Sequence, residues 1–129
     1  MRRSRILGLG RHLPERVVSN DDLAALMDTS DAWIRERSGI RERRYVEPGS
    51  VTCSQLGAEA SRRALAAAGL EPGQIDLIIF ATLSPDYFFP GNGVFLQDLL
   101  GCGTVGALDI RNQCTGFVYG LSVADQFIR

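Results

Sequence analysis

The sequence has few of the residues that build metal centres and disulfide frameworks. It contains one histidine, His12, and three cysteines, at positions 53, 102 and 114, with no Cys-x-x-Cys pair. Without closely spaced ligands, no zinc or other metal site is expected. An odd and sparse set of cysteines is typical of a reducing compartment, so we expect a cytoplasmic protein without a disulfide framework.

The sequence also lacks an excess of charge of either sign and a long apolar run. Lys and Arg number 14 and Asp and Glu 15, which gives a formal net charge of −1. This balance favours neither a nucleic acid nor an anionic membrane as a partner. Gly8 and Gly10 interrupt the short apolar run near the N-terminus, which argues against a signal peptide or a membrane span there. With 129 residues, 45% of them hydrophobic, the chain suits one domain with a buried core.

The first third of the chain is expected to hold one strand and two helices. The pattern predicts, in order, a strand over residues 5–10, a loop over 11–19, a short helix capped by Asn20, and a second helix over 31–38. Gly39 can end the second helix. Residues 41–44 mix three arginines with a glutamate, which is typical of a solvated surface.

The rest of the chain alternates helices with strands. Thr52 and Gln55 form a capping-box pattern that opens a helix, and Gly69 can end it. Further along, the pattern predicts a buried strand over residues 75–82, a loop over 83–93, a helix over 94–100, a buried strand over 105–110 and a last helix over 117–128. This alternation predicts an α/β fold with a mostly parallel sheet flanked by helices.

Cys114 follows the last predicted strand and precedes the last predicted helix. Its thiol would lie at a helix N-terminus and at the carboxyl end of a parallel strand, where backbone amides and the helix dipole favour a thiolate. The position therefore favours a nucleophile, although most cysteines are small buried hydrophobic residues and Cys114 could be one. Cys53, in a helix cap region, and Cys102, between glycines, favour structural roles. Nothing in the pattern brings His12 to Cys114 as a base.

Two further features suit a ligand but also have plainer explanations. Trp33 and Arg37 are four residues apart, so they share a helix face and can present two flat groups to a ligand such as adenine. An arginine folded over an exposed tryptophan explains the same pair. Residues 87–89 (Tyr-Phe-Phe) follow a buried strand, and they either plug the core or line an acyl pocket or a subunit interface.

Taken together, the chain resembles the N-terminal portion of β-ketoacyl-acyl-carrier-protein synthase III, a condensing enzyme of the thiolase superfamily. The resemblance runs along essentially the whole chain. Its motifs, in order, are residues 13–15, 28–31, 33–34, 37–43, 114–117 and 121–126.

The resemblance implies a thiolase-like layered fold of two similar α/β halves. Residues 1–129 would form the N-terminal half, the chain would stop inside the helix after Cys114, and the C-terminal half would be absent. Cys114 would be the catalytic nucleophile, acylated by an acyl-coenzyme A and then condensed with malonyl-acyl-carrier protein to initiate fatty acid or related polyketide synthesis. No cofactor is implied, because the coenzyme A thioester is a substrate.

The resemblance also assigns binding residues and an assembly. Trp33 and Arg37 match positions that hold the adenine of coenzyme A, and Thr29 matches a neighbour in that coenzyme A site. Phe89 and Phe117 match positions at the acyl pocket or the interface of a homodimer. Acyl-coenzyme A, malonyl-acyl-carrier protein and a second copy of the chain are thus the expected partners, with no nucleic acid and no membrane.

Two departures from the family pattern leave alternatives open. Gln113 and Thr115 flank the cysteine where the family commonly has small residues, so a specialised primer is possible. The family's catalytic His and Asn lie in the second half, so this chain alone is expected to be inactive and poorly stable as a monomer. The alternatives are another thiolase-fold condensing enzyme, such as a hydroxymethylglutaryl-coenzyme A synthase-like, head-to-head or polyketide-priming type, and a non-catalytic fragment that binds acyl-coenzyme A.

Overall fold

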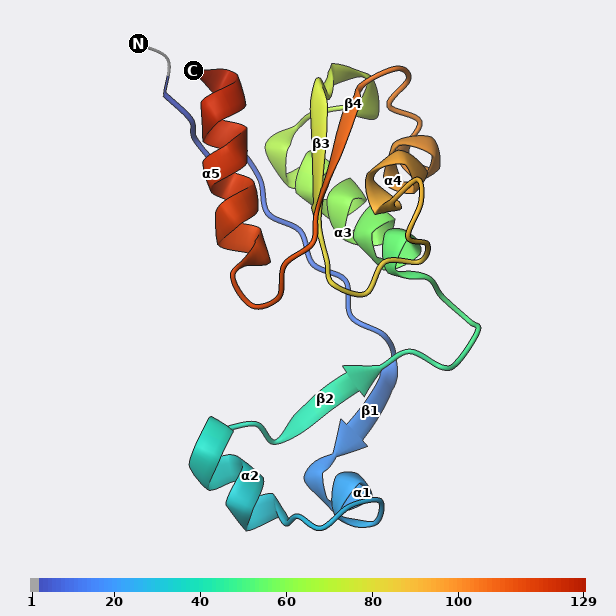
Figure 1. Cartoon of the computed structure of the whole chain (residues 1–129), viewed down its shortest axis with the longest axis vertical. Coiled ribbons are helices and arrows are strands. Elements are labelled where there is room, and N and C mark those ends of the chain that lie inside the picture. The colour runs from blue at the N-terminus through green and yellow to red at the C-terminus, as the bar shows by residue number, and fades with distance from the viewer. Residues whose placement is uncertain (1–2) are drawn as a thin grey trace. The chain divides into compact units, whose positions relative to one another are not determined.

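The computed structural model describes residues 3–129 (Figure 1). Its contacts divide the chain into two compact units. The larger unit comprises residues 3–12 and 52–129, and the smaller unit comprises residues 13–51. Each unit has its own helices and its own pair of strands.

A parallel pair of strands forms the sheet of the larger unit. Strand β3 (Leu77–Ala81) pairs with β4 (Gly106–Ile110), with Leu77 opposite Gly106 and Ala81 opposite Ile110. Both strands lie inside the segments predicted from the sequence, and the parallel pairing is confirmed. The two strands therefore end at the same edge of the sheet, and the loops that follow them leave from that edge.

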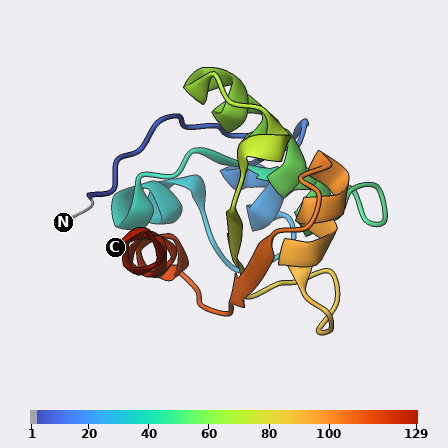
Figure 2. The same ribbon diagram turned by 90° about the horizontal axis from the view of Figure 1, so that it is seen from above.

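Helices cover both faces of this parallel pair, as Figure 2 shows for α4 and α5. Helix α3 (Cys53–Ala68) and helix α4 (Asn92–Leu100) lie on one side, and helix α5 (Gly116–Ile128) lies on the other. A short 3₁₀ turn, η1 (Pro72–Gln74), leads from α3 into β3. The core on the α3 and α4 side is Ala58, Ile78, Leu96 and Cys102. Fold class and layering agree with the sequence prediction.

Helix α3 begins and ends where its sequence predicts. The Thr52 hydroxyl accepts a hydrogen bond from the Gln55 amide, and the Gln55 side chain accepts one from the Thr52 amide. Gly69 ends the helix at φ 67°, a left-handed conformation that costs little without a Cβ. Both ends are therefore encoded within a few residues of sequence.

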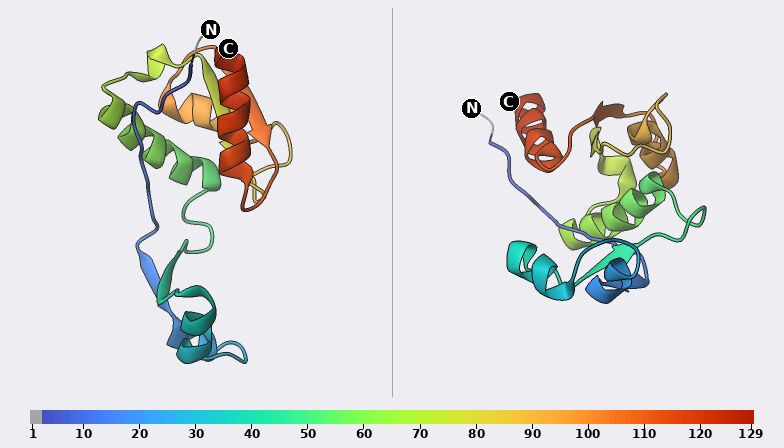
Figure 3. Two further views of the ribbon diagram at one scale, coloured as in Figure 1. Left: turned by 90° about the vertical axis from the view of Figure 1, so that its left-hand side faces the viewer. Right: turned by 60° about the horizontal axis from the view of Figure 1, so that its bottom comes forward.

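The segment predicted as the first strand is not a strand in the structure. Residues 5–10 run extended along α3 (Figure 3) without pairing to a described strand. Gly8 and Gly10 lie so close to the α3 backbone that an added Cβ would overlap the Ala64 and Ala60 carbonyls. The prediction was wrong because an apolar extended segment suits packing against a helix as well as it suits a sheet.

The smaller unit contains two strands that the sequence pattern did not reveal. Strand β1 (Arg16–Ser19) pairs antiparallel with β2 (Glu42–Tyr45), and Arg16 lies opposite Tyr45. Residues 16–19 were predicted as loop and residues 41–44 as solvated surface. Neither segment shows a clear alternation of apolar and polar residues, so the pairing depends on contacts between distant parts of the chain.

The helices of the smaller unit are α1 (Asn20–Ala24) and α2 (Asp31–Ser38). Helix α2 has the predicted bounds, with Ser30 as its N-cap and Gly39 at its end. Helix α1 begins differently, because Ser19 is the N-cap, in a capping box with Asp22. The predicted cap, Asn20, is instead the first helical residue and is only 1% exposed.

Candidate functional site

Cys114 lies in the segment that joins β4 to α5, at the edge of the sheet where the parallel strands end (Figure 1). We call residues 111–115 the cysteine loop. The Gly116 amide donates to the Gln113 carbonyl at 3.0 Å and the Tyr119 amide to the Thr115 carbonyl at 2.9 Å, which closes the loop into the first turn of α5. Cys114 thus precedes the helix by two residues, in agreement with the sequence prediction.

Helix α5 differs from the other α-helices at its N-terminus. At the start of each of the other four α-helices, a side-chain oxygen accepts a hydrogen bond from a backbone amide. The accepting residues are Ser19, Ser30, Thr52 and Asp109. At the start of α5 the Thr115 side chain makes no capping hydrogen bond, and no other side chain of residues 3–129 caps this end. The Gly116 amide is taken by the Gln113 carbonyl, but the Phe117 and Val118 amides have no hydrogen-bond partner among residues 3–129. These two amides remain available to an anion, which the positive end of the helix dipole favours.

The three cysteines occupy different environments. Cys102 is in the apolar core, and Cys53 is half-buried at the start of α3, where its thiol lies 3.8 Å from the Thr82 hydroxyl. Cys114 alone of the three is exposed. Small electrophiles can therefore reach its sulfur most readily, whereas the location of Cys102 fits the structural role predicted for it.

The loop that leaves the same sheet edge after β3 carries the aromatic cluster. We call residues 82–91 the aromatic loop. Tyr87 packs against Phe95 of α4, with ring centroids 5.4 Å apart. Phe88 and Phe89 are 87% and 88% exposed, so neither plugs the core within residues 3–129. Of the alternatives left by the sequence, a pocket or an interface remains for these two rings.

A polar network at the base of the aromatic loop was missed by the sequence reasoning. The Asp86 carboxylate accepts hydrogen bonds from the Cys53 and Ser54 amides, at 2.6 and 2.9 Å. It thereby caps α3 from outside the helix. The Asp86 amide in turn donates to Oδ1 of the fully buried Asn92 at 2.9 Å. An acidic residue inside an otherwise aromatic loop was the available signal.

The same network perturbs the charge state of Asp86. Partial burial alone would raise its pKa, but hydrogen bonds from the Ser54 hydroxyl and from the Ser54 and Cys53 amides outweigh that effect, and the pKa of Asp86 lies below its usual value. The carboxylate therefore stays ionised at neutral pH. Asp109 of β4 caps α4 in a similar way, because its carboxylate accepts hydrogen bonds from the Asn92 and Gly93 amides, at 2.8 and 3.0 Å.

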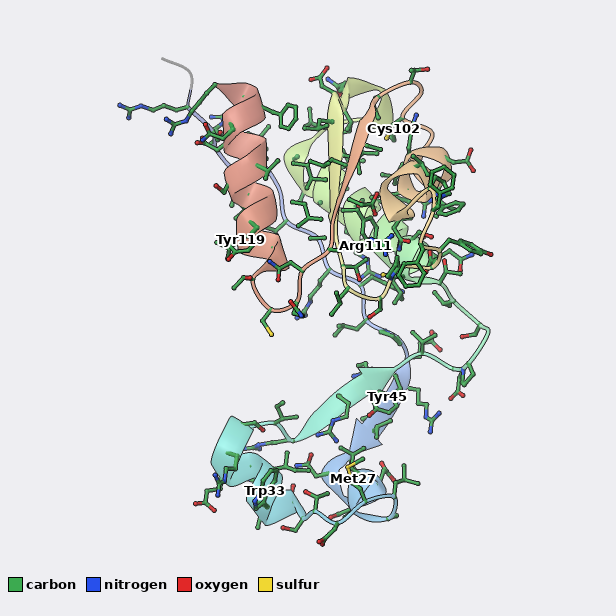
Figure 4. The ribbon with its side chains drawn as sticks, in the orientation of Figure 1. Met27, Trp33, Tyr45, Cys102, Arg111 and Tyr119 are labelled. Carbon is green, nitrogen blue, oxygen red and sulfur yellow. The ribbon has the colours of Figure 1, made fainter. Side chains whose placement is uncertain are left out.

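The residues expected to hold coenzyme A lie together in the smaller unit. Trp33, labelled in Figure 4, is 55% exposed on α2, and the Arg37 guanidinium carbon lies 5.5 Å from its ring centroid. A depression of about 350 Å³ is lined by Trp33 with residues 28–30, which include Thr29. The Thr29 hydroxyl is buried without a hydrogen-bond partner in the described chain. This geometry fits a site for adenine, and it equally fits an arginine folded over an exposed tryptophan.

Comparison with known proteins places the chain among condensing enzymes, although no family model matches it. It is 52% identical over 128 residues to β-ketoacyl-[acyl-carrier-protein] synthase III of Alkalilimnicola ehrlichii. The aligned region covers 98% of this chain and 39% of that protein. The crystal structure of 3-oxoacyl-[acyl-carrier-protein] synthase III from Aquifex aeolicus superposes with a TM-score of 0.91 at 43% identity, over 96% of this chain and 40% of that one.

By sequence and by fold, this chain is related to the N-terminal portion of β-ketoacyl-[acyl-carrier-protein] synthase III. It spans about 39% of the length of the curated relatives it matches. The priming β-ketosynthase of the R1128 polyketide pathway is also similar, with a TM-score of 0.88 at 38% identity over 95% of this chain and 36% of that one. The thiolase-like fold expected from the motifs is thus confirmed. None of the helices in residues 3–129 is both long and apolar enough to cross a bilayer.

Proposed function

We propose that the protein is an acyltransferase of the synthase III type whose nucleophile is Cys114. The observation that carries the proposal is the exposed thiol of Cys114 at the carboxyl edge of the parallel strands, two residues before a helix N-terminus that no side chain of residues 3–129 caps. The sequence similarity to synthases III over 98% of the chain supports the same chemistry.

In the first half-reaction, the Cys114 thiolate attacks the carbonyl carbon of an acyl-coenzyme A thioester. A new carbon–sulfur bond forms, and negative charge develops on the carbonyl oxygen. Uncapped amides in the first turn of α5 are suitable donors to that oxygen. The bond to the coenzyme A sulfur then breaks, the coenzyme leaves as a thiol after taking up a proton, and Cys114 retains the acyl group.

In the second half-reaction, the acyl group passes to a carbon nucleophile. Decarboxylation of malonyl-acyl-carrier protein releases carbon dioxide and leaves a carbanion, which attacks the acyl carbon on Cys114. The thiolate leaves and the enzyme is regenerated. This sequence requires neither a metal nor a cofactor, and the coenzyme A thioester is a substrate.

Apolar side chains near the thiol suit an acyl chain or a second subunit. Phe117 is 66% exposed in the first turn of α5, three residues after Cys114, and Phe89 is 88% exposed in the aromatic loop. Exposed rings of this size are costly in water unless a ligand or another chain covers them. We assign both to the acyl pocket or to the interface of a homodimer.

The smaller unit is proposed to bind the adenine end of coenzyme A. Trp33 and Arg37 offer an indole and a guanidinium plane on one face of α2, and Thr29 adds a buried hydroxyl that has no hydrogen-bond partner in the described part of the chain. A flat, hydrogen-bonding base suits this combination. Binding of free coenzyme A should therefore weaken about 10-fold in Trp33→Ala, because an aromatic stacking contact contributes about 1–3 kcal/mol.

The test is acylation of the natural gene product that contains this chain. The protein is incubated with a panel of acyl-coenzyme A thioesters, and its intact mass is measured. One acyl adduct, absent from Cys114→Ala, is the expected result. Cys53→Ser is the matched control, because it removes the half-buried thiol at the start of α3 and should keep the adduct.

Three outcomes would contradict the proposal. They are no adduct with any donor, an adduct that survives Cys114→Ala, and an adduct that Cys53→Ser removes. The donor that reacts fastest would also identify the primer, and thereby separate fatty acid initiation from priming of a polyketide. Release of carbon dioxide from malonyl-acyl-carrier protein after acylation would then establish the condensation step.

A further inference from the structure

The side chain of Asn112 holds the backbone of the cysteine loop. Its Oδ1 accepts a hydrogen bond of 2.8 Å from the Gln113 amide. On the other side of the same residue, the Gln113 carbonyl accepts a hydrogen bond of 3.0 Å from the Gly116 amide. The two peptide groups that flank the Gln113 Cα are therefore both hydrogen-bonded, which leaves the φ and ψ angles of Gln113 little freedom. Figure 4 labels Arg111, the first residue of this loop, and Tyr119, which follows it in α5.

A planar peptide group carries this restraint to Cys114. The Gln113 carbonyl and the Cys114 amide belong to one trans peptide unit, so they point in opposite directions. Because the carbonyl is directed at the Gly116 amide, the Cys114 amide is directed away from it. That amide has no hydrogen-bond partner among residues 3–129. Asn112 and Gly116 thus fix between them the Cα of Cys114 and the direction in which its thiol leaves the backbone.

Asn112 also lies where the cysteine loop packs against the end of β3. Asn112 is half-buried, and Gly116, the first residue of α5, is buried. A Cβ on Gly116 would lie 3.3 Å from the Ala81 Cβ and 3.9 Å from the Asn112 Cβ, so there is little space into which this turn could relax. Within residues 3–129, no other side chain forms a hydrogen bond to the backbone of residues 111–115.

We propose that Asn112 is a positioning residue that, through the peptide groups of Gln113, orients the thiol and the amide of Cys114 for attack on the acyl-coenzyme A thioester. This inference rests on the proposed function. Its physical basis is that a nucleophile reacts only from a narrow range of distances and directions, and a misplacement of about 1 Å can lower the rate about 100-fold. An exposed thiol on a loop keeps such a geometry only when neighbouring hydrogen bonds support it.

Two variants of similar size test the acceptor oxygen of Asn112. Asn112→Leu removes the acceptor and roughly keeps the shape, whereas Asn112→Asp keeps an acceptor in the same place. The natural gene product is treated with saturating acetyl- or octanoyl-coenzyme A, whichever reacts faster with wild type. The rate of acyl transfer to Cys114 is expected to fall about 10- to 100-fold in Asn112→Leu and to recover in part in Asn112→Asp. The dissociation constant of free coenzyme A should be unchanged in both.

Hydrogen exchange of the Gln113 amide tests the hydrogen bond itself. Exchange at this amide should be faster in Asn112→Leu than in wild type and should slow again in Asn112→Asp, since only the aspartate offers an oxygen to it. This readout needs no acyl donor, so it separates the contact from the reaction. If Asn112→Leu does not fold, Asn112→Ala carries both measurements.

Gln74→Ala is the matched control. Gln74 Oε1 accepts a hydrogen bond of 2.9 Å from the Glu71 amide, so it is also a carboxamide that holds a local turn of the larger unit. Its turn is η1, which precedes β3, whereas the cysteine loop follows β4. Gln74→Ala should speed exchange at the Glu71 amide and leave the acylation rate of Cys114 unchanged.

The outcomes separate this inference from the proposed function. If wild-type protein gives no adduct on Cys114, both fall. If the adduct forms at the same rate in wild type and Asn112→Leu, the role of Asn112 is wrong and the proposed function stands. A Gln113 amide that exchanges equally fast in wild type and Asn112→Leu would also overturn the inference. So would an equal loss of rate in Gln74→Ala, because general loosening would then explain the effect.

Discussion

The two units of this chain are built on different kinds of interior. The larger unit has an apolar core of Ala58, Ile78, Leu96 and Cys102 between a parallel strand pair and its helices. The smaller unit has only two buried residues among 13–51, Val18 and Asn20. One unit is therefore held largely by burial of apolar surface, and the other depends on the hydrogen bonds of a single buried amide.

Asn20 connects three separate parts of the smaller unit. Its Nδ2 donates to the Asp31 carboxylate at 2.8 Å and to the Ile40 carbonyl at 2.9 Å, and its Oδ1 accepts from Arg43 Nη2 at 2.5 Å. The start of α2, the second residue after that helix and strand β2 thus converge on one side chain. The hydrogen bond from Asn20 also holds the pKa of Asp31 below its usual value. A small unit with little apolar surface can gain a specific structure in this way.

The largest expected effect is on the apolar core. Leu96→Ala should lower the free energy of unfolding by about 3 kcal/mol, because Leu96 is 7% exposed and its truncation leaves a cavity. Leu26→Ala is the matched control, since Leu26 is 77% exposed in the smaller unit and should change little. Urea denaturation checks both, and similar values for the two variants would contradict the apolar-core assignment.

The next effect should be confined to the smaller unit. Asn20→Ala leaves Asp31 and Arg43 without their buried partner, which is expected to cost about 2 kcal/mol. Hydrogen exchange should rise in α1, α2, β1 and β2 and stay unchanged in α3 and α4, whereas Leu96→Ala should do the reverse. Asn20→Asp is a second test, since it restores an acceptor for Arg43 but places a carboxylate against Asp31. Equal increases of hydrogen exchange in both units of Asn20→Ala would show that Asn20 does not stabilise the smaller unit specifically.

A smaller effect concerns the cap that Asp86 places on α3. Asp86→Asn should cost about 1 kcal/mol at pH 7, because the amide has one acceptor oxygen in place of two charged ones. The folded-state pKa of Asp86 lies below its unfolded value near 3.8, so its contribution is present above that value and is lost as the pH falls through the folded pKa.

The acid sensitivity of the wild type and Asp86→Asn should therefore differ. Stability is measured by urea denaturation at pH 7 and at successive values below pH 4, and the gap between the two proteins is expected to close as the pH falls. The lowered pKa values of Asp22 and Asp31 are shared by both proteins, so they cancel in the comparison. A gap that stays constant over this range would show that the charge of Asp86 does not stabilise α3.

The smallest expected effects come from the local helix caps, one in each unit. Thr52→Ala and Ser30→Ala each remove a side-chain acceptor of a first-turn amide and should cost about 1 kcal/mol. In Thr52→Ala, hydrogen exchange in α3 should rise only slightly, because Asp86 still caps that helix. Helix α2 has no such second acceptor among the described residues, so its hydrogen exchange should rise more. The reverse order of exchange rates would contradict this.

Much of the fold followed from sequence, and most of the errors have one cause. The bounds of α2 and α3 and the parallel strands were predicted because caps and apolar periods act within a few residues. The first strand was wrong, β1 and β2 were missed, and Asn20 was misassigned as a cap. The strand errors depend on partners distant in the chain, and so does the buried role of Asn20, whose partner Arg43 is 23 residues away. The cap error is local, because the capping box joins Ser19 and Asp22, three residues apart.

The candidate site also has features that the sequence predicted and features that it did not. The place of Cys114 between a strand and a helix could be predicted, because the pattern of the flanking elements fixes it. Its exposure, the cap that Asp86 places on α3 and the hydrogen bond from Arg111 to the Phe88 carbonyl could not be predicted. Asp86 and Cys53 are 33 residues apart, and Arg111 and Phe88 are 23 apart, so no local pattern marks them.

The sequence by itself determined the helix caps, the parallel strand pair and the position of the nucleophile proposed for this chain. Thr52 and Gln55, three residues apart, show why, since their hydrogen bonds form as soon as one turn of helix forms. Only the tertiary structure decided which cysteine is exposed, which acid caps α3 and which arginine holds the aromatic loop. Those contacts exist only after distant segments pack together, because a side chain reaches just a few ångströms from its own backbone.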